Sequence, residues 1–143
     1  MPSGIRVIAR TTSVIGLSSL AALHAIWASG SPWPAQSPKR LAEAVVGQKV
    51  TMPSAAPTAV VAAGTAGAAL AASGALGNGR LIRIGLRSLS MVMLLRAALG
   101  GDAALAALGM PPAGKRFQRL DRRWYRPFAA ILGAALWLSS RRR

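Results

Sequence analysis

The sequence predicts an all-α fold, a single domain over residues 1–143 that forms a membrane-embedded four-helix bundle, with three spans as the alternative. Apolar stretches bounded by arginine or proline lie at about 11–29, 57–76, 84–101 and 124–140. Runs of about 20 apolar residues are typical of transmembrane helices. Hydrophobic residues make up 52% of the chain and aromatic residues only 5%, so a core in water would bury little area. Small residues instead suit helix contacts in lipid.

The first helix is predicted to end at Gly30-Ser31-Pro32, where glycine and proline both stop a helix. Trp27 and Trp33 lie near this end, and indoles favour the membrane interface. A signal peptide is the alternative, because Arg6 and Arg10 precede the run. The run is longer than a usual signal core and includes His24, which favours a retained helix.

The second helix begins at Pro57, which suits a first helical position. A polar connection precedes it and includes a short interfacial helix, Lys39–Val46. Gly64, Ala68 and Ala72 recur at four-residue spacing, which favours close helix packing. The short turn 77–79 predicts that the second and third helices form an antiparallel hairpin.

The third helix starts with a basic ridge of Arg80, Arg83 and Arg87, whose side chains are expected to reach toward lipid phosphates. It either breaks at Gly100-Gly101 or continues through 103–108. The fourth helix is the shortest and reaches spanning length only if residues 124–126 join it, which is why three spans remain the alternative.

The formal net charge is +15, from 18 Lys/Arg against three acids. The basic residues lie at the edges of the apolar runs, which indicates anionic headgroups of a lipid bilayer as partners, and no nucleic-acid motif accompanies them. Disulfides and thiol chemistry are excluded because there is no cysteine. One histidine is too few for a multi-histidine metal site, so we expect no cofactor, no metal and no enzyme activity.

We expect a multi-pass protein of the bacterial cytoplasmic (inner) membrane. With four helices, one side carries eight basic residues and the other nine, so the positive-inside rule does not set the orientation. Arg141–Arg143 directly follow a helix end, and on this ground we predict both termini in the cytoplasm.

Arg96 is the polar residue that most needs an explanation. It lies thirteen residues after Arg83, about 20 Å along the helix at ~1.5 Å per residue. A charge in lipid costs ~2.5–3.5 kcal/mol, so Arg96 needs a partner or must extend to the far interface. Asp102 lies on a different helical face, whereas Asp121 is an inter-helix candidate. Asp121 could instead cap an interfacial turn that includes Tyr125.

Three runs, HAIWASGSPWP (24–34), LLRAALGGD (94–102) and RFQRLDRRWYRPF (116–128), resemble an uncharacterised family of small bacterial four-helix integral membrane proteins. Its pattern has a Gly-Ser-x-Trp-Pro turn, an Arg-x-x-Gly-Asp type helix end and an Asp-x-x-x-Tyr-x-Pro entry to the last helix. The matching positions here are Gly30, Ser31, Trp33, Pro34, Arg96, Gly100 or Gly101, Asp102, Phe117, Asp121, Tyr125 and Pro127. Residues 103–108 depart from the pattern because they lack its aromatics. The resemblance implies the fold and brings no known activity.

Two functional hypotheses follow. The first is one polar, aromatic-rimmed cluster that serves as a structural keystone or binds a lipid headgroup, a small ligand, a protein partner or a second copy of the chain. Its members are His24, Trp27, Trp33, Arg96, Asp102, Asp121 and Tyr125. The alternative is a small transporter or exporter. No acid lies in the middle of a predicted span, so only His24 could couple transport to protons.

Overall fold

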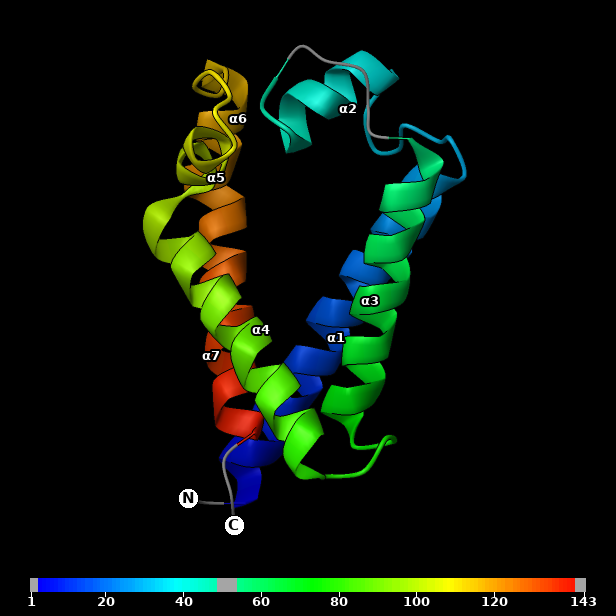
Figure 1. Ribbon diagram of the computed structural model, residues 1–143, viewed down its shortest axis with the longest axis vertical. Helices are drawn as coiled ribbons and strands as arrows, with labels where there is room; N and C mark the ends of the chain where they lie inside the picture. Colours follow the sequence, from blue (N-terminus) through cyan, green and yellow to red (C-terminus); the bar gives the residue numbers. More distant parts are fainter. Residues whose placement is uncertain (1–2, 49–53, 141–143) are drawn as a thin grey trace.

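Four long helices form two pairs that meet at one end and diverge toward the other (Figure 1). α1 (Ser3–Ala28) packs on α3 (Ala55–Ser73), and α4 (Arg80–Leu99) packs on α7 (Arg126–Ser139). Contacts between α1 and α7 join the two pairs. The computed structural model describes residues 3–48 and 54–140, and over these ranges the chain is all-helical.

Shorter elements gather at the end where the pairs diverge. They are α2 (Pro38–Val45), α5 (Gly101–Ala107), α6 (Lys115–Leu120) and the π-helical turn η1 (Asp121–Tyr125), which runs directly into α7. α2 contacts α6, so it lies across this end (Figure 1). We call this the capped end, and the opposite end, where α1 begins and α7 ends, the basic end.

The all-α prediction is confirmed, and the helix boundaries differ in detail. The first helix begins at Ser3 rather than near residue 11, and the third at Arg80 rather than at 84. The last helix is preceded without interruption by η1 and α6, so helical structure extends over 115–139. The short helix predicted at 39–46 is present as α2. The break at Gly100 is also present, because this residue has a φ of 79°, which ends α4.

Two of the described helices, Gly4–Ala28 and Ala55–Ser73, are long and apolar enough to cross a membrane. α4 and α5 give a third if their pair, bent by 102°, is counted as one span. By length and composition the described helices therefore reach two or three spans and fall short of four. α4 carries four arginines, and α7 has only 14 residues. These helices indicate a membrane protein.

Many large apolar side chains lie on the outer surface of the bundle, as expected for helices in lipid. Val60, Leu81 and Ile8 are 71%, 82% and 67% exposed. Ser13 and Ser90 are fully buried between the helices, alongside the leucines and alanines of the core. The Ser90 hydroxyl donates to the Gly133 carbonyl of α7 at 2.7 Å, an inter-helix hydrogen bond of a kind common in membrane bundles.

Two of the three residues of the predicted small-residue row, Ala68 and Ala72, take part in packing. Ala72 is buried, but no atom outside the helix lies within 4 Å of the position that a Cβ of Gly64 would occupy. A close helix approach is found elsewhere: a Cβ on Gly133 would lie 2.9 Å from Leu94 Cγ. The hairpin prediction is also corrected. The second and third predicted helices, α3 and α4, contact each other little, because each packs mainly on another partner.

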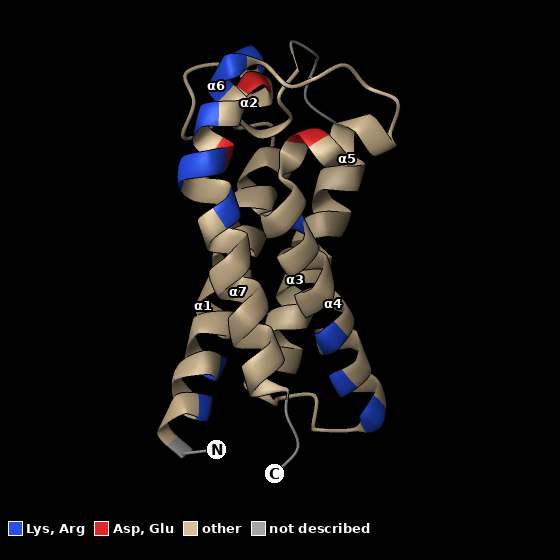
Figure 2. Ribbon diagram, turned by 90° about the vertical axis from the view of Figure 1, so that its left-hand side faces the viewer, with Lys and Arg blue, Asp and Glu red and all other residues tan. Residues whose placement is uncertain are grey.

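Figure 2 shows Lys and Arg toward both ends of the helices, separated by a band with few charges. The acidic residues lie only at the capped end: Glu43 in α2, Asp102 in α5 and Asp121 in η1. The basic end carries arginines without a neighbouring acid among the described residues. The two ends are thus chemically different surfaces.

Gly133→Ala should destabilise the bundle by about 1–3 kcal/mol, because the new methyl group would overlap Leu94 and force α4 and α7 apart. Gly85→Ala is the matched control, since no atom outside its own helix lies within 4 Å of that position. We expect a lower Tm in detergent for Gly133→Ala and an unchanged or higher Tm for Gly85→Ala. Equal Tm values would contradict close α4–α7 packing.

Candidate functional site

The Asp121 carboxylate joins three segments at the capped end. Its side chain is 7% exposed; Oδ1 accepts from Arg96 Nη2, and Oδ2 accepts from the Gly101 N–H at 3.0 Å. Arg96 lies in the last turn of α4, Gly101 begins α5, and Asp121 begins η1. One carboxylate therefore holds the α4–α5 bend against the entry to α7. We call this arrangement the Asp121 clamp.

The two glycines of the bend are required by this geometry. Gly100 has a positive φ, and a Cβ there would lie 3.2 Å from Asp121 Oδ2. A Cβ on Gly101 would overlap the buried Phe117 ring. The close approach of the carboxylate therefore depends on Gly100, and the packing of the Phe117 ring against the bend depends on Gly101.

Asp102 makes a separate set of contacts and does not pair with Arg96. Its Oδ1 accepts from the Ala113 N–H at 2.8 Å, and its Oδ2 accepts from Gln118 Nε2 at 3.2 Å. Gln118 Nε2 also donates to the Ala113 carbonyl at 3.0 Å. Asp102 thus fixes the α5–α6 connection to both of its flanking helices.

Tyr125 connects the clamp to α2. Its hydroxyl donates to the Ala44 carbonyl at 3.0 Å, and its ring packs on Phe117 with centroids 5.9 Å apart. Tyr125 precedes α7 and lies outside the candidate spans. Burial raises the pKa of Tyr125 from its ordinary value of 10.0 and outweighs the opposing effect of Arg116. The hydroxyl therefore stays protonated at neutral pH and remains a donor.

Further contacts at the capped end come from residues that the sequence pattern does not single out. Arg126 Nε donates to the Ala97 carbonyl at 2.7 Å, so its guanidinium covers the carbonyl end of α4. Gln48 Nε2 donates to the Pro111 carbonyl at 2.7 Å, and the Gly114 N–H donates to the Gly47 carbonyl at 2.9 Å. Arg126 is one of six basic residues within 115–126, so the sequence does not distinguish it from its basic neighbours.

The remaining predicted site residues form their own group at the end of α1. His24 Nδ1 lies 2.8 Å from the Leu20 carbonyl, and its ring centroid is 5.0 Å from that of Trp27. Trp27 Nε1 donates to the Trp33 carbonyl at 2.7 Å. Within the described part of the chain, no hydrogen bond or ion pair joins this group to the Asp121 clamp. The structure therefore divides the seven predicted residues between the two helix pairs instead of forming a single cluster.

The aspartate side chains of this region are hydrogen-bonded within the chain. Asp121 and Asp102 both accept internal hydrogen bonds, and no group of three or more His, Asp or Glu residues in 3–48 and 54–140 could hold a metal ion. Arg96 Nη1 is buried without a hydrogen-bond partner. A cavity of about 170 Å³ lies next to the clamp, lined in part by Gly100, Asp102 and Asp121.

With this geometry in place, comparison with known proteins identifies a family. The family model described as "Protein of unknown function (DUF3995)" matches residues 17–136. The chain belongs to this family. The match covers the C-terminal part of α1, the entire capped end and most of α7. No curated protein and no solved structure matches the chain.

Arg96→Leu should lower the stability of the bundle by up to about 3–5 kcal/mol, because it leaves a buried carboxylate without its counter-charge. Arg122→Leu, an exposed neighbour, removes the same charge and should have little effect. Adding Asp121→Asn to Arg96→Leu should recover part of the loss, since the amide oxygen still accepts from Gly101. The measurement is Tm in detergent. Equal Tm values for Arg96→Leu and Arg122→Leu would contradict a stabilising role for the Asp121 clamp.

Tyr125→Phe should release α2 at a cost of about 0.5–1.5 kcal/mol, because it removes a single hydrogen bond and keeps the ring. Hydrogen exchange should become faster in Pro38–Val45 and stay unchanged in α3. Trp124→Phe is the control, since Trp124 is 59% exposed. If Trp124→Phe speeds exchange in α2 as much, the Tyr125 contact does not hold this helix.

Proposed function

We propose that this protein is a multi-pass integral protein of the bacterial cytoplasmic membrane with a non-enzymatic interaction role. One observation carries the membrane assignment: the long helices expose large apolar residues over a band that separates two charged ends. Such a surface is stable in lipid and would aggregate in water.

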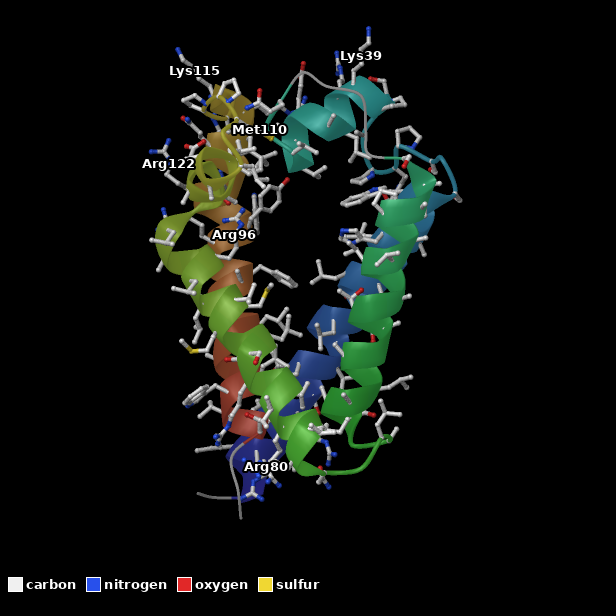
Figure 3. All side chains as sticks on the ribbon, in the orientation of Figure 1. Lys39, Arg80, Arg96, Met110, Lys115 and Arg122 are labelled. Atoms are coloured by element: carbon white, nitrogen blue, oxygen red, sulfur yellow. The ribbon has the colours of Figure 1, made fainter. Side chains whose placement is uncertain are left out.

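The interaction role is supported by the construction of the capped end. The Asp121 clamp, Asp102 and Tyr125 fix α2, α5 and α6 to one another, so this end can present a rigid surface. Lys39, Lys115 and Arg122 point outward from it (Figure 3). Leu108 at the end of α5 is also exposed at this end, and basic and apolar groups together suit a partner protein with acidic side chains.

A catalytic role receives no support from the described residues. The chain has no thiol, and His24 lies against a carbonyl of its own helix. Two of the three acids accept internal hydrogen bonds. The transporter alternative stays a prediction that depends on His24, since all three acids lie at the capped end.

Photo-crosslinking in native membranes tests the interaction role. A crosslinkable residue at Leu108 should give a discrete adduct with one protein, and an excess of a non-crosslinkable copy of the chain should diminish it. The same residue at Leu81, which is 82% exposed on α4, should give only lipid adducts. Lipid adducts alone at both positions would contradict a partner at the capped end.

The predicted orientation can be tested directly because the chain has no native cysteine. Gln36→Cys lies before α2 at the capped end, and Ala75→Cys lies in the turn after α3 at the basic end. With both termini cytoplasmic, an impermeant maleimide should label Gln36→Cys in intact spheroplasts and Ala75→Cys only after permeabilisation. The reverse pattern would invert the orientation, and labelling of both in intact spheroplasts would contradict a spanning bundle.

A further inference from the structure

The basic end holds a cavity that neither the family nor the proposed interaction role explains. Its volume is about 340 Å³, and residues from α1, α3, α4, the α3–α4 turn and the end of α7 line it. Pockets that bind small molecules begin at about 300 Å³, so this cavity is large enough for a polar headgroup. Arg6, Arg10 and Arg83 line it, whereas no acidic residue does.

These three arginines converge although they carry the same charge. Arg10 Nε donates to the Ala72 carbonyl at 3.0 Å, and Arg83 Nη1 donates to the Asn78 carbonyl at 3.1 Å. Both contacts fix a guanidinium at the cavity and leave its other N–H groups available. Three cations around one cavity repel each other unless an anion lies between them.

Arg6 provides a second, independent observation. Its Nε is buried and has no hydrogen-bond partner among the described atoms. A buried donor without an acceptor costs about 1–3 kcal/mol, more when the group is charged. An oxyanion in the cavity would supply both the missing acceptor and the missing negative charge.

The fold is shaped around one of these side chains. Gly74 ends α3 with a φ of 82°, and a Cβ there would overlap the Arg10 guanidinium. The Arg10 side chain can therefore lie across the carbonyl end of α3, where a cation is favourable. The backbone conformation at Gly74 thus leaves room for the Arg10 guanidinium at the edge of the cavity.

We propose that this cavity binds a phosphate group, held by Arg6, Arg10 and Arg83 as the anion-recognising side chains. Guanidinium groups bind phosphate oxygens through paired, charge-assisted hydrogen bonds. Arg80 and Arg87 lie on the same helix outside the cavity; Arg87 instead lies over the Trp137 ring, 5.4 Å from its centroid. The site is thus distinct from the general contact of a basic surface with lipid.

The position and lining of the cavity indicate the anionic phospholipid headgroup as the source of that phosphate. Ala72, Ile82 and Leu86 provide an apolar wall beside the arginines, which suits the glycerol end of a lipid. The site lies at the edge of the apolar band, where headgroup phosphates lie if the protein spans the bilayer (Figure 2). This choice of source depends on the membrane assignment; the phosphate site itself does not.

The test measures affinity of the purified full-length protein in an uncharged detergent at constant ionic strength. The probes are short-chain phosphatidylglycerol, short-chain phosphatidylcholine and inorganic phosphate. Arg6→Gln and Arg83→Gln should each weaken phosphatidylglycerol binding at least tenfold. Arg80→Gln, which removes the same charge from the same helix, should weaken it less than twofold. Arg6→Lys keeps the charge but loses the paired geometry, so its affinity should lie between those of wild type and Arg6→Gln.

Each outcome decides a separate point. Binding of phosphatidylglycerol tighter than that of inorganic phosphate or phosphatidylcholine supports the lipid source, and equal affinity for inorganic phosphate supports a soluble one. An equal loss in Arg80→Gln and Arg83→Gln would show that the cavity is only part of a general basic surface. No binding of any probe would contradict the phosphate site. Tm without ligand confirms that each variant folds. If Arg83→Gln unfolds, Arg83→Lys replaces it. Extraction of the protein from membranes by carbonate would contradict the membrane assignment without affecting the detergent measurement.

Discussion

The buried Asp121 carboxylate is the constraint on which the capped end depends. It accepts from a side chain of α4 and from the first N–H of α5, and it belongs to the turn that leads into α7. A buried charge is costly unless it is paired and hydrogen-bonded, so these three segments can separate only at a high free-energy cost. Arg96, near the end of a helix with an apolar surface, is stabilised in the same way. The carboxylate thus explains why the bend between α4 and α5 has one defined geometry.

Around this carboxylate, three other polar residues each hold a different segment of the capped end. Asp102 holds the α5–α6 connection, Tyr125 holds α2, and Arg126 covers the carbonyl end of α4. Between the ends, a buried serine and an unsubstituted glycine allow α4 and α7 to approach closely. The polar contacts at the capped end are therefore local, and the helices below it are joined by a core of leucine and alanine side chains.

The two ends of the molecule differ in how the charges of their arginines are balanced. At the capped end Arg96 has a carboxylate partner within the chain, whereas at the basic end Arg6, Arg10 and Arg83 meet around a cavity with no acid in its lining. The Asp121 carboxylate supplies the counter-charge in the first arrangement, although Arg96 Nη1 is buried without a hydrogen-bond partner. The second calls for an anion from outside, which is why a phosphate site follows from the charge distribution as well as from the cavity.

The sequence by itself determined the helical class, the presence of helices long and apolar enough to span a membrane, and the candidates for the clamp, because apolar run length and isolated charges are local properties. Asp121 could be named as a partner for Arg96 since a charge in an apolar helix requires one. The rest depended on tertiary structure. Helix pairing places His24 and Trp27 on a different helix pair from Arg96, and no sequence period encodes this separation. The convergence of Arg6 and Arg83 brings together helices that are distant in the chain, so only the packed bundle could reveal it.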